Sequence, residues 1–389
     1  MILKRHLFQK AEELLQKYPM LVITGPRQSG KTTFARQLRP GYTYLNMEIG
    51  ENREYAGKDP HGFLQTFRGG VILDEVQQVP DLFPYLQYYT DMRGEVGEYI
   101  LSGSQHFLLL EKVTQSLAGR IAIFELQPFS LEELWESEWA PQRWEDILTK
   151  GFYPRLHSFN ITPADFYPDY IQTYAERDVR QITNVVDLNQ FRTFLSLCAG
   201  RIGQLLNLSS LGNDLGIDGK TVKSWLSILE TSFIAYRLPP YFQNFDKRLV
   251  KTPKLYFYDT GLAAWMLGIR TPADLDLHFA KGALFENFVI NELMKNRLNA
   301  HQRPNFYFWQ DKNNNEIDLI IDEVTRQELI EIKAGKTISA EFFKHFSKYT
   351  PLVPIPALRF WVVYGGDQNQ IRSDATVTTW NGLSKINFP

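Results

Sequence analysis

With 389 residues, 44% of them hydrophobic, the chain is longer than one hydrophobic core usually serves, so we expect two or three domains. Its formal net charge of −2 excludes a protein that is basic over its whole surface, and any nucleic-acid surface must be a local patch. The single cysteine, Cys198, excludes an intramolecular disulfide and fits a reduced cytoplasm.

Residues 1–18 have the periodicity of an amphipathic helix that leads into an apolar strand at Met20–Thr24. Charged residues are mixed into this helical pattern, so it lacks the uncharged core of a signal peptide. No apolar run approaches the length that spans a bilayer. We therefore expect a cytoplasmic protein without a membrane partner.

A phosphate-binding loop is predicted directly after this strand, because the sequence fits GxxxxGK[ST] and a helical pattern follows. Glycines let backbone N–H groups converge on phosphate oxygens at the positive end of the helix. Lys31 is expected to reach the β- and γ-phosphates, and the Thr32 hydroxyl to ligate Mg²⁺. The alternative is a glycine-containing turn with a chance lysine. The predicted nucleotide-binding residues are Gly25, Pro26, Arg27, Gln28, Ser29, Gly30, Lys31, Thr32 and Thr33.

Two further strands are expected at residues 42–46 and 69–75, and the second ends in paired acids. This is the pattern of a Walker B strand. Asp74 is expected to hold Mg²⁺, and Glu75 to orient the attacking water as general base. The alternative is a buried strand that ends in solvated acids.

The next strand, residues 98–104, ends in hydroxyl residues, and Ser102 or Ser104 is a candidate sensor of the γ-phosphate. A helix cap is the alternative for Ser104. A helix over 105–120 and a strand over 121–126 are expected next. Arg120 lies at their junction, where AAA-type rings carry an arginine finger; an arginine that satisfies the helix dipole is the alternative.

Four phrases in this order, TGPRQSGKTT, VILDEVQ, ILSGSQ and SLAGR, resemble the prokaryotic AAA-type ATPases whose C-terminal half was long described only as a domain of unknown function. Later phrases extend the resemblance over nearly the whole chain. It implies an α/β P-loop ATPase core with ATP and Mg²⁺ as cofactors, and a homo-oligomer, ring or dimer, as the assembly. The later phrases are GFYP at 151–154, YIQTYAERDV at 170–179, GQLLN at 203–207, KLYFYDTGL at 254–262 and GALFENFV at 282–289.

Residues 127–200 have a helical pattern broken by prolines, and we expect a small α-helical lid. An arginine in this region is a candidate second nucleotide sensor. Spacing does not choose between Arg155, Arg177 and Arg180, and a local ion pair is the alternative for each.

Residues 208–230 have the rhythm of a helix-turn-helix, and a hairpin-like segment follows. These features predict a winged helix in which Lys220, Lys223 and Ser224 meet DNA. A packing or oligomer module is the alternative. The segment 236–254 has a local excess of four positive charges, which suits phosphate contacts. Its charged residues are Arg237, Lys247, Arg248, Lys251 and Lys254 against Asp246.

Strands are expected at 305–310, 316–322 and 328–333, after a helix over 283–293. Glu286 on the helix, Asp318 on a strand, and the pair Glu331 and Lys333 resemble the centre of a restriction-endonuclease-like fold. Alternation along the strand places Glu331 and Lys333 on one face. The three acids are predicted Mg²⁺ ligands, and Asp318, Glu331 and Lys333 are predicted to act in phosphodiester cleavage.

The predicted fold class is therefore α/β: a P-loop AAA-type ATPase core at 1–135, a helical lid at 136–200, a winged helix at 201–256, and a restriction-endonuclease-like domain at 257–389. We expect ATP hydrolysis coupled to action on DNA. The sequence leaves two functions open, namely an ATP-dependent nuclease or DNA-remodelling enzyme, and a nucleotide switch whose C-terminal domain only binds DNA or a protein. Without a cation among them, the clustered acids would repel one another, so removal of one acid is expected to leave stability equal or better.

Overall fold

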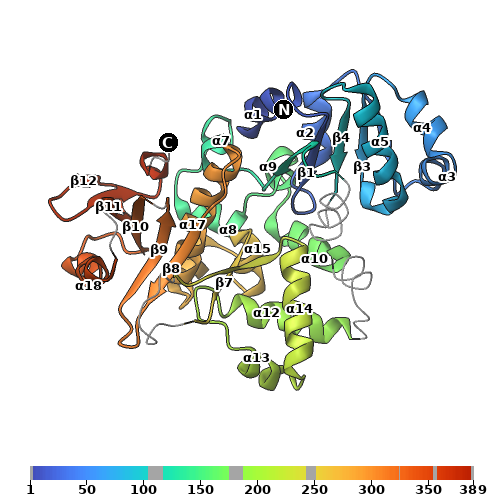
Figure 1. Ribbon diagram of the computed structural model, residues 1–389. Helices are drawn as coiled ribbons and strands as arrows, with labels where there is room; N and C mark the ends of the chain where they lie inside the picture. The colour runs from blue at the N-terminus through green and yellow to red at the C-terminus, as the bar shows by residue number, and fades with distance from the viewer. Residues whose placement is uncertain are drawn as a thin grey trace. The chain divides into compact units, whose positions relative to one another are not determined.

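The computed structural model describes residues 3–103, 117–174, 187–241, 251–323, 325–353 and 357–386. Its contacts divide the chain into two compact units (Figure 1). The first unit comprises Met1–Phe129 with the short pieces Thr231–Phe233 and Leu298–Gln302, and the second comprises the remainder. The finer division into lid, winged helix and C-terminal domain stays a prediction.

The first unit is built on a parallel sheet of five strands in the order β2-β3-β4-β1-β5. The predicted strand at 20–24 is confirmed to the residue, and those at 42–46, 69–75, 98–104 and 121–126 are confirmed with shifted ends. The elements of this unit are α1 (Leu7–Leu15), β1 (Met20–Thr24), α2 (Lys31–Leu38), β2 (Thr43–Asn46), α3 (Gly50–Lys58), α4 (Pro60–Thr66), β3 (Val71–Asp74), α5 (Phe83–Arg93), β4 (Tyr99–Ser102) and β5 (Ile121–Glu125).

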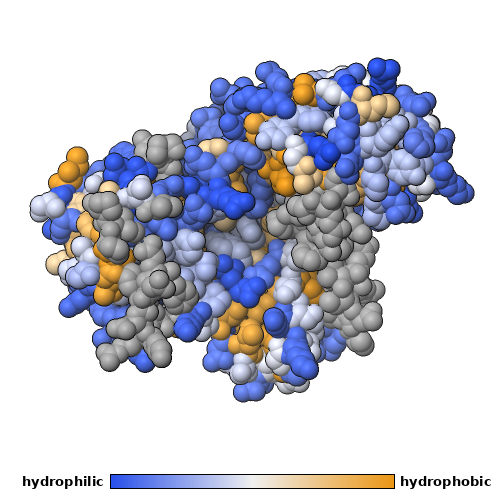
Figure 2. Space-filling view, in the orientation of Figure 1, coloured by the Kyte–Doolittle hydropathy of each residue, from blue (hydrophilic) through white to orange (hydrophobic). Residues whose placement is uncertain are grey.

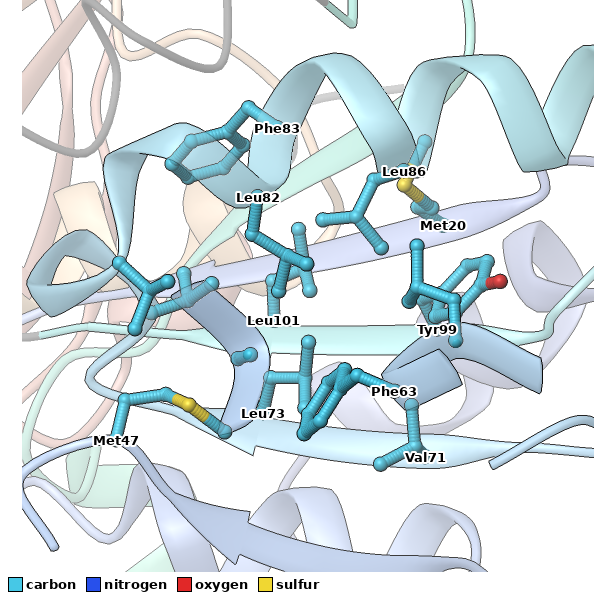
Figure 3. Close-up of a cluster of buried hydrophobic side chains, with 14 of the residues drawn as sticks. Met20, Met47, Phe63, Val71, Leu73, Leu82, Phe83, Leu86, Tyr99 and Leu101 are labelled. Atoms are coloured by element: carbon cyan, nitrogen blue, oxygen red, sulfur yellow. The ribbon is translucent and has the colours of Figure 1, made fainter. Parts of the chain in front are cut away.

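Helices cover both faces of this sheet, which is why its central strands are apolar without alternation. Leu21, Ile72 and Ile100 pack on one face with residues of α1 and α2. The neighbouring strand residues point the other way, and Figure 3 shows Leu73 and Leu101 among side chains of α4 and α5. This three-layer arrangement places the carboxyl ends of β1, β3 and β4 side by side.

The first half of the second unit is mostly helical and contains an antiparallel pair of strands, β6 and β7. Helix α12 packs against α13 and α15 and contacts β7. The elements are α7 (Leu131–Trp135), α8 (Trp144–Lys150), α9 (Pro154–Ser158), α10 (Pro163–Tyr174), α12 (Leu188–Ala199), α13 (Leu208–Leu215), α14 (Gly219–Thr231), β6 (Ala235–Leu238), β7 (Lys254–Phe257), α15 (Thr260–Met266) and α16 (Pro272–Leu277).

The second half of this unit carries a mixed sheet of six strands in the order β12-β13-β11-β10-β9-β8. Strand β10 pairs antiparallel with β9 and parallel with β11. The long helix α17 is tied to β7 because Asn287 accepts from the backbone N–H of Phe257 at 2.9 Å. The elements are α17 (Lys281–Asn299), β8 (Phe306–Gln310), β9 (Glu316–Asp322), β10 (Arg326–Lys333), α18 (Phe346–Tyr349), β11 (Ala357–Tyr364), β12 (Gln370–Ile371) and β13 (Thr376–Thr379).

Among the described residues, no helix combines the length and the apolar character that crossing a membrane requires. Figure 2 shows a face that is hydrophilic over most of its area, with hydrophobic groups in separate places. The most exposed large apolar side chains in the described chain are those of Leu277, Phe279 and Ile371.

Candidate functional site

The loop between β1 and α2 needs glycine at two positions. Gly25 has φ of +141°, and a Cβ built there would lie 2.3 Å from the carbonyl oxygen of Leu126. Gly30 has φ of +94° and is the residue before the first turn of α2. Both conformations are costly for residues with a side chain. The sequence pattern of the loop therefore reflects its backbone, which wraps the N-terminus of α2.

Lys31 and Arg5 both hydrogen-bond to backbone carbonyl groups of this loop or of the chain beside it. The Lys31 ammonium donates to the carbonyl oxygens of Gly25 at 3.0 Å and Pro26 at 2.8 Å. The Arg5 guanidinium donates to the carbonyl oxygens of Ser29 at 3.1 Å and Gln127 at 2.7 Å. Sequence reasoning missed Arg5, because no pattern connects residue 5 with residues 29 and 127.

Asp74, at the end of β3, is the point where three strands and the loop helix meet. Its Oδ2 accepts from the Thr32 hydroxyl at 2.7 Å and from the Tyr44 hydroxyl at 2.7 Å. Its Oδ1 accepts from the Ser102 hydroxyl at 2.6 Å. Strand register explains the last contact, since Asp74 and Ser102 are direct partners in β3 and β4. The structure thus brings together Thr32, Asp74 and Ser102 as the sequence predicted, and it adds Tyr44.

Glu75 follows Asp74 in a left-handed backbone conformation, with φ of +53° and ψ of +43°. Residues with a Cβ adopt this conformation at a cost, and such positions gather at functional sites. The Glu75 carboxylate accepts a hydrogen bond from the Gln77 amide. The turn thereby aims Glu75 away from the direction that a continued strand would give it.

The loop residues and Asp74 fit a nucleotide with Mg²⁺. The loop offers the glycine-dependent backbone that cradles phosphate, and the Ser29 hydroxyl is buried with no hydrogen-bond partner in the described structure. Thr32 and Asp74 offer hard oxygen atoms that lie within hydrogen-bonding distance of each other. Mg²⁺ prefers such ligands and keeps several waters.

Arg120 lies in the turn before β5, and the helix predicted over 105–120 falls mostly outside the described residues, as does Ser104. The Arg120 guanidinium makes two hydrogen bonds to Asp91, Nε to Oδ1 at 2.6 Å and a terminal nitrogen to Oδ2 at 2.8 Å. Both residues are on the surface of the first unit, so the arginine is held where another molecule can reach it.

Substitution of Tyr44 by phenylalanine tests whether its hydroxyl holds Asp74. We expect half-maximal ATP turnover to require about 10-fold more Mg²⁺, because a hydrogen bond to a charged group contributes about 1.5–3 kcal/mol. ATP titrated at fixed Mg²⁺, and Mg²⁺ at fixed ATP, give the two affinities. Tyr42→Phe is the matched control, since that hydroxyl donates to the carbonyl oxygen of Gly97. Equal Mg²⁺ affinities in the two variants would contradict the assignment.

A second cluster of ionisable groups lies in the second unit, on α17 and β9. One carboxylate oxygen from each of Glu286, Glu316 and Asp318 lies within 4.8 Å of the other two. Glu286 comes from α17, and the other two come from the same face of β9, two residues apart. Sequence reasoning named Glu286 and Asp318 but missed Glu316, although the strand period of two gives a signal that finds it.

Glu331 and Lys333, on the neighbouring strand β10, extend this cluster. The Lys333 ammonium lies 2.8 Å from Asp318 Oδ2 and 2.7 Å from Glu331 Oε2. His345 Nδ1 lies 3.3 Å from Glu331 Oε1. The structure therefore brings all four predicted residues of this centre into one place. The three acids whose oxygens lie close enough to share a metal ion, however, are Glu286, Glu316 and Asp318. The sequence predicted Glu331 as the third acid, and the structure has Glu316 in that role.

The structure corrects the prediction for Lys254. The sequence placed it in a basic segment that tracks a phosphate backbone, but its side chain is buried, with 3% of the residue exposed. Its ammonium group hydrogen-bonds to Glu316 and lies 3.4 Å from Glu286 Oε1. Glu286 also accepts from the Tyr256 hydroxyl. The prediction was wrong because a count of charges in a window of sequence contains no information about burial.

These contacts shift the pKa values of the cluster in opposite directions. Burial raises the pKa of Glu286 to about 7, against the opposing effect of Lys254. Burial also raises the pKa of Glu316 and Glu331. For Asp318 the ammonium groups of Lys333 and Lys254 outweigh burial and hold the pKa below its usual range. The cluster is thus a set of paired charges in which Asp318 is the most firmly ionised acid.

The helix-turn-helix segment forms α13 and α14, and Lys220, Lys223 and Ser224 are exposed on α14. Arg237 on β6 pairs with Glu230, one of its terminal nitrogens donating to Oε2 at 2.7 Å. Lys251 is exposed. Lys247 and Arg248 lie outside the described residues, as do the candidate sensors Arg177 and Arg180.

Comparison with known families matches three stretches of the chain. Residues 17–135 match a family described as AAA domain (AAA_14), and residues 141–273 and 281–382 match two domains of unknown function, DUF8612 and DUF4143. The uncharacterized proteins Rv2008c of Mycobacterium tuberculosis and Mb2031c of Mycobacterium bovis are each 30% identical over 381 residues, which is 97% of this chain and 83% of theirs.

Solved structures give weaker likenesses. The Walker-type ATPase PABY2304 of Pyrococcus abyssi aligns with 16% identity and a TM-score of 0.41, over 68% of this chain and 96% of that one. The STAND protein PH0952 of Pyrococcus horikoshii, which has a tetratricopeptide repeat sensor, aligns with 11% identity and a TM-score of 0.24, over 75% of this chain and 47% of that one. Both scores are too low to support a conclusion.

Proposed function

The chain, which matches an AAA domain at 17–135 and DUF4143 at 281–382, belongs to one family with Rv2008c, and we propose that ATP hydrolysis in its first unit drives action on DNA by its second unit. The AAA domain is an ATPase domain. Its residue roles, the DNA substrate and the chemistry of the second unit are proposals, and each has its own test.

In the proposed hydrolysis step, backbone N–H groups of residues 27–33 bind the phosphates, and Lys31 exchanges its carbonyl partners for phosphate oxygens. Thr32 and Asp74 hold Mg²⁺, which neutralises phosphate charge when bound. Ser102 and Tyr44 keep the Asp74 carboxylate oriented. Glu75 takes the proton of the attacking water.

Arg120 is proposed to act on nucleotide in a neighbouring copy of the chain, and this requires that it leave Asp91. A mixture of Arg120→Ala and Glu75→Gln proteins should then regain ATPase activity, because some interfaces combine an intact Arg120 with an intact Glu75. Phosphate release measured across mixing ratios gives a maximum at intermediate ratios. A straight line between the two single-variant values, or a chain that stays monomeric with ATP, contradicts action in trans.

For the second unit we propose a metal-dependent nuclease centre. The observation that carries this proposal is the convergence of Glu286, Glu316 and Asp318 within 4.8 Å, with Lys333 paired to Asp318. Carboxylate oxygens at this spacing suit Mg²⁺, and a lysine beside them can stabilise the charge that develops on a phosphate. The donor set therefore fits Mg²⁺ in kind, with waters completing the shell of the ion.

The test is a cleavage assay with purified full-length protein on linear, nicked, single-stranded and branched DNA, with Mg²⁺, with and without ATP. We expect at least one DNA form to be cut with Mg²⁺ and spared with EDTA. If every form stays intact under all conditions, the nuclease proposal is wrong. The alternative is a nucleotide switch that binds DNA or a protein without cleavage. One observation favours it: Lys254 and Lys333 already pair with all four acids of the centre.

DNA binding itself is proposed for the exposed lysines of the helix-turn-helix segment and its wing. Replacing Lys220, Lys223 and Lys251 by glutamine should weaken binding to every DNA sequence and reduce the slope of log affinity against log salt by about 0.9 for each phosphate that the variant no longer neutralises. Fluorescence anisotropy from 50 to 300 mM salt, roughly the range where such slopes are measured, gives both quantities. Lys58→Gln and Lys17→Gln, on the surface of the first unit, are controls. An unchanged slope would contradict DNA binding by these lysines and would favour a packing role for the segment.

A further inference from the structure

Lys254 is the first residue of β7, far in sequence from the acids that it contacts. Its neighbours on the β6 side are set by the antiparallel register, in which Lys254 pairs with Leu238. A further bridge joins it to Leu205. The backbone of Lys254 thus belongs to the two-stranded sheet after α14, while its side chain ends in the acidic cluster on α17 and β9.

We propose that Lys254 competes with the divalent cation of the second unit: its ammonium group occupies the cation position between Glu286 and Glu316, and a metal ion binds only when this side chain withdraws. This inference rests on the proposed metal centre. It goes further, because it proposes that a side chain of this protein, Lys254, keeps the metal ion out of the centre.

The spacing of the carboxylate oxygens leaves room for one cation. Two oxygen ligands of one ion lie at most twice the metal–oxygen distance apart, which is about 4 Å for Mg²⁺ and about 5 Å for Ca²⁺. The oxygens of Glu286, Glu316 and Asp318 lie within 4.8 Å of one another, a spacing that one divalent cation bridges directly or through water. The ammonium group of Lys254 already binds Glu316 and lies 3.4 Å from Glu286. A metal ion on the same oxygens would lie within a few ångströms of this positive charge, and the two cations would repel each other.

The charges of the centre agree with competition. Four acids, Glu286, Glu316, Asp318 and Glu331, face two lysines, Lys254 and Lys333, so a formal charge of −2 remains when all are ionised. Lys333 sits on the other side, between Asp318 and Glu331, and leaves Glu286 and Glu316 to Lys254. Removal of Lys254 alone therefore frees the Glu286 and Glu316 oxygens, while Asp318 keeps its contact with Lys333. Lys254 is the first residue of β7, so withdrawal of its side chain is expected to disturb this end of the strand.

The experiment measures Mn²⁺ binding by calorimetry, without nucleotide, in full-length protein that carries Asp74→Asn to exclude the site in the first unit. Lys254→Met and Lys254→Gln should bind Mn²⁺ at least 10-fold more tightly than the parent. Lys254→Arg should show no gain, since it keeps a cation among the acids. Added Glu316→Gln should remove the gain. Thermal melting of each variant shows whether it is folded, and Lys254→Gln serves if Lys254→Met is not.

Hydrogen exchange of residues 254–257 gives a second readout in the parent protein. Saturating Mn²⁺ should accelerate exchange in β7, because the ion displaces the side chain that anchors this strand. If the parent and Lys254→Gln bind Mn²⁺ equally, the inference is overturned while the metal centre stands. If no variant binds Mn²⁺ better than Asp318→Asn, both the inference and the proposed centre are overturned. Parent binding without faster exchange in β7 also overturns the inference.

Discussion

Replacing Glu75 by glutamine should lower ATP turnover by about 100-fold or more while nucleotide affinity stays within a few-fold of the parent. General-base assistance contributes about 10²–10⁴ to such rates, and an amide of the same shape cannot accept the proton of water. The left-handed backbone at position 75 is unaffected, since glutamine has the same branching as glutamate. Phosphate release at saturating ATP gives the turnover, and a fluorescent nucleotide titration gives the affinity.

Two further variants serve as a control and as a contrast for this result. Glu54→Gln, on the exposed face of α3, should behave as the parent. Lys31→Ala should lose nucleotide binding, because its ammonium group, which donates to carbonyl oxygens of the loop, is expected to bind the phosphates there. The two losses are therefore separable. Parental turnover in the Glu75→Gln variant would show that another group activates the water.

Replacing Asp318 by asparagine should abolish metal-dependent cleavage, with a loss of at least about 100-fold, and should also destabilise the second unit. Asp318 accepts from the Lys333 ammonium and from the backbone N–H of Ile332 at 2.7 Å. An amide at this position weakens both hydrogen bonds, and a hydrogen bond to a charged group contributes about 1.5–3 kcal/mol, while Lys333 keeps Glu331 as its ion-pair partner. Denaturant unfolding measures the stability, and cleavage of the best DNA form measures the activity.

This expectation reverses the sequence-based one, in which removal of an acid relieves repulsion. The structure shows that the Asp318 carboxylate accepts from the Lys333 ammonium and from the backbone N–H of Ile332, and we expect the loss of these two contacts to outweigh the relief of repulsion. Asp374→Asn, an exposed aspartate of the same unit, is the control and should change neither property. A variant as stable as the parent would mean that the ion pair contributes no net stability. Retained cleavage would exclude Asp318 from the chemistry.

Local sequence was sufficient for the phosphate-binding loop and for the strand that ends in Asp74 and Glu75. Each is a continuous segment in which the backbone conformation requires particular residues, as the positive φ of Gly25 and Gly30 does. Buried parallel strands are recognisable in the same way, because both faces are covered and the residues are apolar throughout. The helix, the strands and three of the acids of the second centre were predicted for related reasons of period and polarity.

The partners of these residues were decided by tertiary structure alone. Tyr44 reaches Asp74 from the neighbouring strand β2, and Arg5 reaches the loop from the segment before α1. The local sequence around Lys254 predicts a surface charge, yet the register of β7 places its side chain in the acidic cluster. A hydrogen bond or an ion pair between remote segments depends on how sheets and helices stack, and a residue's own neighbours in sequence carry no record of that stacking. The motifs of this protein were therefore determined by its sequence, while the charge balance that governs its second centre was determined by the fold.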